Sequence, residues 1–204
     1  MILGSRLSLS AMGSEKKDLK KLLQKIRLYN IVCVQTNYRS EIMNVKDLVK
    51  IIQASECAQI ATFGKEETEG FPEIRALLNL ANPKKFPKLK DKAISVEGDT
   101  VTLYFTTNTS SRKVRQIRAN KKVCMYFCIP EKFKGISAIG TIEEITDQKI
   151  KEDFWQTGWL IYYHKGVKDP DYTLLKFTSK YMHCWGGAKT HDFGQPVNSS
   201  EKVD

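Results

Sequence analysis

The chain has 204 residues, of which 41% are hydrophobic and 27% charged, and its formal net charge is +10. This composition is ordinary for a globular protein, and the length suits one domain with a single core and terminal extensions. No apolar run approaches the ~20 residues that a membrane-spanning helix needs, so we expect no membrane association. The lysines and arginines are spread along the chain, which favours a solubilising surface over nucleic-acid binding.

The cysteines indicate a reducing compartment. There are five, an odd number, and none forms a CxxC pair, so reduced thiols are expected and neither a disulfide framework nor a zinc site is predicted. A cytoplasmic location follows. Residues 1–14 contain Arg6, serines and no acid, so an organelle-targeting segment or a disordered start is the alternative.

Apolar patterning divides the chain into three parts. Residues 1–43 are predicted to be an N-terminal extension with an amphipathic helix, residues 44–188 a barrel domain, and residues 189–204 a polar and loose C-terminal tail. Within the domain, the pattern predicts in chain order a helix after Asn44, strands 58–63 and 71–80, a loop 82–92, strand 101–106, helix 111–119, strands 123–129 and 135–145, helix 147–156 and strand 172–185. Six short strands that do not alternate with helices indicate a mainly β protein with flanking helices (α+β), built as an antiparallel barrel.

The turn that leads into helix 111–119 carries the clearest functional signal. A strand ends, hydroxyl and amide side chains fill the turn, and the helix begins with Arg112 and Lys113. A helix N-terminus offers unpaired N–H groups and the positive end of the helix dipole, which suits a phosphate. Cations in this first turn oppose the dipole, and a bound dianion would account for them. The alternative is a serine-capped surface helix whose charges are solvated.

Four parts of the domain carry a family resemblance. They are 71–76, 104–113 with 117–123, 140–143, and the stretch from Trp155 to Tyr172. Their content and order resemble the FMN-binding split-barrel superfamily that includes pyridoxamine 5'-phosphate oxidase, especially its general-stress-protein-like members. The resemblance spans about 45–187 and implies an antiparallel six-stranded split β-barrel. It also implies a homodimer with FMN between the subunits.

The same resemblance implies the residues of the site. Those expected at the FMN phosphate are Arg75, Ser111, Arg112 and Lys113, and those expected along the ribityl chain and the ring edge are Ala76, Thr106 and Thr107. Guanidinium, ammonium and hydroxyl groups together satisfy a dianionic phosphate through charge-assisted bonds. Trp185 is expected beside the flavin, with core or interface packing as the alternative.

Departures from the oxidase pattern bear on the substrate. Leu80 stands where the oxidase has a lysine, and Lys189 and His191 are out of register with its C-terminal basic residues, so vitamin B6 oxidation is not expected. The sequence predicts an FMN-binding oxidoreductase acting on an unknown small molecule, with no catalytic residue assigned. The alternatives are a non-catalytic flavin-binding or stress-response protein, or a barrel holding haem or a deazaflavin. His164 and His183 are candidate proton donors, with structural roles as the alternative.

Overall fold

The computed structural model describes residues 44–65, 68–187 and 189–197, so the predicted N-terminal extension lies outside the described residues. The helices are α2 (Val45–Ala54), α3 (Arg112–Ala119) and α4 (Gln148–Phe154), with 3₁₀ helices at Pro130–Lys132, Thr157–Ile161 and Gly166–Lys168. The strands are β1 (Cys57–Phe63), β2 (Pro72–Leu78), β3 (Ile94–Glu97), β4 (Thr100–Asn108), β5 (Lys122–Ile129), β6 (Lys134–Ile145), β7 (Tyr172–Gly186) and β8 (Lys189–Gly194). No helix within these ranges is long and apolar enough to cross a membrane.

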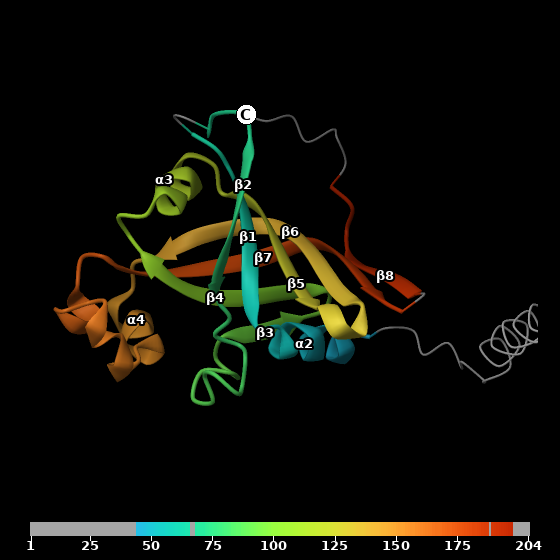
Figure 1. Ribbon diagram of the computed structural model, residues 1–204, viewed down its shortest axis with the longest axis horizontal. Coiled ribbons are helices and arrows are strands. Elements are labelled where there is room, and N and C mark those ends of the chain that lie inside the picture. The colour runs from blue at the N-terminus through green and yellow to red at the C-terminus, as the bar shows by residue number, and fades with distance from the viewer. Residues whose placement is uncertain (1–43, 66–67, 188, 198–204) are drawn as a thin grey trace, which may run out of the picture. The chain divides into compact units, whose positions relative to one another are not determined.

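All eight strands form one antiparallel sheet in the order β2-β1-β5-β6-β7-β4-β3, with β8 paired to the second half of β7 (Figure 1). The strands β2 and β4 contact each other although they are not neighbours in that order, so the sheet coils into a barrel with a split between them. The predicted fold class is confirmed: the protein is mainly β with flanking helices, in a split barrel. The sheet has eight strands rather than the expected six because β3 and β8 extend it.

The barrel is filled by large apolar side chains that alternate along its strands. Phe105 of β4, Phe127 of β5 and Phe177 of β7 are each at most 1% exposed. Strand β1 shows the alternation directly, since every second residue from Ala58 to Thr62 is buried and those between them are half-buried. Each strand therefore has one face toward the barrel interior and one face outward, and this division separates the candidate site residues.

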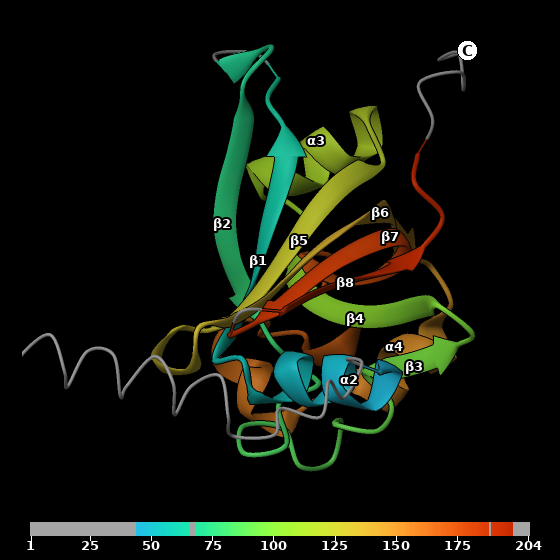
Figure 2. The same cartoon turned by 90° about the vertical axis from the view of Figure 1, so that its right-hand side faces the viewer.

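The helices lie on two sides of the barrel. In Figures 1 and 2, α3 lies on the side opposite α2 and α4. Helix α2 begins with a capping box between Asn44 and Asp47 and buries Leu48, Ile51 and Ile52. Helix α4 begins at Asp147, whose side chain accepts bonds from two backbone N–H groups, as the sequence predicted for this cap. Both of these helices thus have side-chain caps.

The C-terminal tail differs from expectation in its first residues. Lys189–Gly194 form β8, which pairs with β7 after a turn at Gly187, where φ is +62°. Phe193 is 5% exposed and anchors this strand to the core. One buried aromatic residue and one glycine turn therefore convert a polar segment into an edge strand. The segment 82–92 forms turns, as predicted, and contributes the buried Leu89.

Candidate functional site

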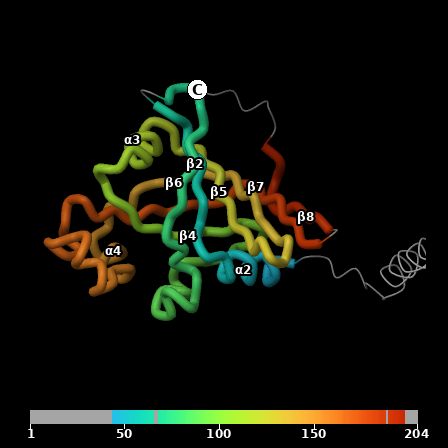
Figure 3. Tube along the Cα trace, in the orientation of Figure 1, coloured from blue at the N-terminus to red at the C-terminus, as the bar shows by residue number. Residues whose placement is uncertain are grey.

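The turn between β4 and α3 is held by Asp171, which directly precedes β7. Its carboxylate accepts bonds from Asn108 Nδ2 at 2.6 Å and from the Ser110 backbone N–H at 2.7 Å. Its backbone carbonyl accepts a bond from the Thr109 N–H at 2.8 Å. Asn108 and Ser110 therefore shape the turn. Figure 3 follows the chain from β4 through this turn into α3.

The N-terminus of α3 lacks a side-chain cap. Ser111 occupies the N-cap position, yet its side chain makes no capping hydrogen bond, and the first turn contains no acidic residue. Within the part of the chain that the structure describes, the Ser111 Oγ is buried and has no hydrogen-bond partner. Serine normally caps a helix, and a buried hydroxyl without a partner is costly. This oxygen and the free N–H groups of the first turn suit an anionic ligand.

Lys113 lies next to this terminus on the first turn of α3. Its Nζ donates a hydrogen bond of 2.7 Å to Thr107 Oγ1 on β4. Burial lowers the pKa of Lys113, and the positive charge of Arg75 lowers it further. Because the charge of Arg75 acts on Lys113, the two cations are close enough to repel each other. An anion bound beside them would relieve both effects.

Arg75 and Arg112 converge on one carboxylate. The Nη2 atoms of Arg75 and Arg112 lie 2.9 Å and 2.8 Å from Glu73 Oε2. The other oxygen, Oε1, accepts bonds of 2.5 Å from Gln116 Nε2 and from Thr68 Oγ1. Arg75 also donates to Thr62 Oγ1 at 2.6 Å through Nη1. Strand β2, the end of β1 and helix α3 are joined here.

Sequence reasoning missed Glu73 and Gln116, although the signal was present. Glu73 lies two residues before Arg75 on a strand, so both side chains point to the same face. Gln116 lies four residues after Arg112 on a helix, so it shares that face of α3. The sequence alone does not show that this carboxylate and this amide meet, because their contact depends on the β1–β2 hairpin packing against α3.

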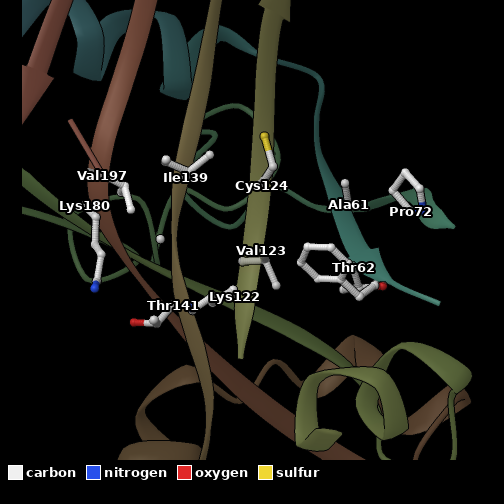
Figure 4. Close-up of a pocket in the computed structure, with 12 residues that line it drawn as sticks. Ala61, Thr62, Pro72, Lys122, Val123, Cys124, Ile139, Thr141, Lys180 and Val197 are labelled. Atoms are coloured by element: carbon white, nitrogen blue, oxygen red, sulfur yellow. The ribbon is translucent and has the colours of Figure 1, made fainter. Parts of the chain in front are cut away.

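A second group of predicted residues lies on the outward face of the sheet. Ala76 alternates with Arg75 on β2 and is exposed, whereas Arg75 is half-buried on the inner side. The outward face also carries a groove of about 320 Å³ between β1, β5 and β6. Ala61, Cys124 and Ile139 lie side by side across it (Figure 4).

Trp185 is on the outward face as well, far along β7 from the turn. It pairs with Gly135, whereas the first residue of β7, Tyr172, pairs with Asn108 at the turn. Its ring stacks against Tyr126 with a centroid distance of 5.6 Å. It also fills the space over Gly135, where an added Cβ would lie 2.3 Å from the ring.

The structure thus divides the predicted site. It brings together Arg75, Thr107, Ser111, Arg112 and Lys113 around the start of α3. The Thr106 hydroxyl points instead to β7, where it donates to the Thr173 carbonyl at 3.3 Å. Ala76 and Trp185 are outside the cluster within one chain. Among the described residues, no group of three or more His, Cys, Asp or Glu is placed to hold a metal ion.

Comparison with known proteins identifies the family. The family model for pyridoxamine 5'-phosphate oxidase-like proteins matches residues 76–194. The chain belongs to the pyridoxamine 5'-phosphate oxidase-like family. A protein from Clostridium acetobutylicum, related to general stress protein 26 and placed in the pyridoxinephosphate oxidase family, is 31% identical; the match covers 73% of this chain and 92% of that one, with a TM-score of 0.57.

The resemblance that the sequence indicated is confirmed by these matches. A conserved hypothetical protein from Mycobacterium tuberculosis shares the fold, at 14% identity over 79% of this chain and 96% of that one, with a TM-score of 0.52. A comparison with curated proteins gave no match. Members of the pyridoxamine 5'-phosphate oxidase-like family typically bind FMN. The cluster at the start of α3 offers cations and a hydroxyl group that suit the phosphate of such a ligand.

Proposed function

We propose that this protein binds FMN, with the flavin phosphate at the start of α3, and acts as an FMN-dependent oxidoreductase on a small molecule. The observation that carries the proposal is the buried Ser111 Oγ, which has no hydrogen-bond partner in the described chain. On the same turn, burial lowers the pKa of Lys113, and the positive charge of Arg75 lowers it further. A phosphate would accept bonds from the hydroxyl, the ammonium and the helix N–H groups, and would offset the repulsion between the two cations.

The residues of the cluster would bind and orient the cofactor. Lys113 is held toward β4 by Thr107, and Arg75 is fixed by Thr62 and Glu73, so both cations are positioned before a ligand arrives. Fixed charges bind an anion with little loss of side-chain entropy. When bound, FMN supplies electron or hydride transfer through its isoalloxazine ring. The protein's part is to hold the phosphate so that the ring has one orientation.

The substrate class follows in part from Leu80. This residue stands where the oxidase pattern has a lysine, and it is fully buried in the core. A buried leucine offers no cation to a second phosphate group. We therefore propose that the substrate is not a vitamin B6 phosphate.

The visible absorption spectrum of the purified full chain tests the function. We expect a flavin spectrum, either as purified or after addition of FMN, and mass identification of FMN after denaturation. Bound flavin that a pyridine nucleotide reduces and an acceptor reoxidises supports an oxidoreductase. Bound flavin without turnover would favour the flavin-binding alternative. A colourless protein that also fails to take up FMN would overturn the proposal.

We further propose that the protein is a homodimer that pairs through the outward face. Phe71, Ile74 and Leu78, at and along β2, are 73%, 66% and 45% exposed. Ile74 pairs with Ala61, which lines the apolar groove of Figure 4. Exposed apolar surface of this extent commonly marks an interface. Ala76 and Trp185 share this face, so a second copy that packs against it would lie next to both residues.

Replacing Ile74 by glutamate is expected to convert the dimer to a monomer, because a charge at the centre of an apolar interface would be buried without a partner. Sedimentation velocity measures the change. The matched control is Glu97→Gln on β3, an exposed position away from this face, which is expected to leave the dimer intact. A wild-type chain that is monomeric at tens of micromolar would contradict the proposal.

A further inference from the structure

Glu73 pairs with both arginines of the proposed phosphate site. Its side chain is only 13% exposed, and each of its oxygens has two partners. The Oε2 atom accepts from Arg75 and Arg112, and the Oε1 atom accepts from Thr68 and Gln116. These two guanidinium groups are the donors that the family resemblance assigns to the flavin phosphate. The protein therefore already holds an anion on its phosphate-binding arginines.

This carboxylate remains charged under all ordinary conditions. Hydrogen bonds from Thr68, Gln116 and Arg75, together with the charge of Arg112, lower the pKa of Glu73 to about 2. A phosphate that approaches Arg75 and Arg112 thus meets a fixed negative charge on the same donors. Lys113 is different, since its Nζ donates to the neutral hydroxyl of Thr107.

The net charge of the cluster also depends on Glu73. Arg75 and Arg112 pair with Glu73, and Lys113 lies close enough to Arg75 to feel its charge, so the cluster holds three cations and one carboxylate, a net charge of two positive units. That balance matches one dianionic phosphate monoester. Without Glu73 the same pocket would carry three positive charges and would attract anions more strongly and with less discrimination.

We propose that Glu73 is a fixed internal anion that competes with the ligand for Arg75 and Arg112, and so sets the affinity and the selectivity of the site for a phosphate. The inference rests on the proposed function only in taking the bound phosphate to be that of FMN. On this view Ser111, Lys113 and the α3 N-terminus provide the main attraction. The two arginines are partly neutralised and limit how tightly the anion is held.

Three full-length variants test the proposal. Glu73→Gln keeps the shape of the side chain and removes its charge. Glu73→Asp keeps the charge. Glu144→Gln is the matched control, because Glu144 pairs with Arg118 at the other end of α3, through contacts of 2.7 and 2.8 Å. Titrations of FMN, riboflavin and inorganic phosphate give the three affinities for each variant.

For Glu73→Gln we expect FMN and inorganic phosphate to bind about tenfold more tightly, and riboflavin, which lacks the phosphate, to bind as in the wild type. The Glu144→Gln variant is expected to stay within about twofold of the wild type, and Glu73→Asp, which keeps the charge, is expected to gain less affinity than Glu73→Gln. A purely structural role would instead make FMN binding weaker in Glu73→Gln. Weaker or unchanged binding of both FMN and phosphate would overturn the proposal.

The outcome also separates this inference from the proposed function. A wild-type chain that binds no FMN, together with tighter phosphate binding in Glu73→Gln, would support the role of Glu73 and overturn the flavin assignment. FMN binding in the wild type without any gain in affinity in Glu73→Gln would support the flavin assignment and overturn the role of Glu73. Should Glu73→Gln fail to fold, Glu73→Met removes the charge with a side chain of similar length, and the same expectations apply.

Discussion

Replacing Arg112 by glutamine and Lys113 by methionine in one variant is expected to weaken FMN binding by at least ~100-fold. Each change removes a charge-assisted hydrogen bond to the phosphate, and such bonds contribute about 1.5–3 kcal/mol apiece. Loss of two corresponds to more than ~100-fold in Kd. Most of the effect should come from Lys113, because Arg112 is 52% exposed and already paired with Glu73. Quenching of flavin fluorescence on titration measures the affinity.

The matched control removes the same two charges elsewhere on the same segment. Arg118→Gln with Lys121→Met alters the last turn of α3 and the residue after its cap, where Arg118 bonds to Glu144. We expect this pair to change the affinity by no more than about threefold, since exposed charges act weakly through solvent. Equal losses in both pairs would mean that general positive charge attracts FMN. Full affinity in the Arg112 and Lys113 variant would remove the phosphate site from α3.

The turn and the start of α3 could be predicted from the sequence because they depend on contiguous residues. A strand, a polar turn and a helix follow one another between Thr100 and Ala119, and the structure has β4, the turn and α3 in that order. Local backbone preference and the helix N-terminus decide this region with little help from distant residues. The cations of the first turn, Arg112 and Lys113, could be recognised for the same reason.

The short edge strands could not be predicted because their stability comes from their partners. The strand β3 has four residues, and it forms only by pairing with β4 across a turn at Gly98, where φ is +57°. The strand β8 likewise depends on the second half of β7. Ile94 and Val96 alternate with polar residues in β3, but four residues are too few to distinguish this pattern from chance, and β8 has one apolar residue, Phe193. The predicted count of six strands missed both of them.

The composition of the site depended on which elements meet in space. Glu73 belongs to the site because folding brings the β1–β2 hairpin against α3, where Gln116 lies 43 residues further along the chain. No local pattern encodes a contact at that separation. The same folding separates Ala76 and Trp185 from the cluster by placing them on the outward face. Alternation along β2 requires Arg75 and Ala76 to point to opposite faces of the sheet. One flavin could therefore contact both residues only by crossing the edge of the sheet, or by contacting Arg75 of one subunit and Ala76 of another.

Replacing Phe177 by alanine is expected to lower the free energy of unfolding by about 3–5 kcal/mol, the usual cost of removing a buried phenyl ring. Phe177 is fully buried in β7 and pairs with Leu103 of β4 and Ile142 of β6. It therefore lies where β7 pairs with β4 on one side and with β6 on the other. The ring also contacts the backbone region of Gly140, where an added Cβ would lie 2.8 Å from it, so little space exists for neighbours to close the cavity. Denaturant unfolding monitored by tryptophan fluorescence measures the loss.

The same truncation at Phe133, which is 80% exposed, is the control and should cost less than ~0.5 kcal/mol. Because a small domain is stable by only about 5–15 kcal/mol, the Phe177 variant should also lose flavin at a lower denaturant concentration than the wild type. A small loss at Phe177 would mean that β4, β6 and β7 repack around the cavity. Equal losses at both positions would place Phe133 in an interface, where a second subunit covers it.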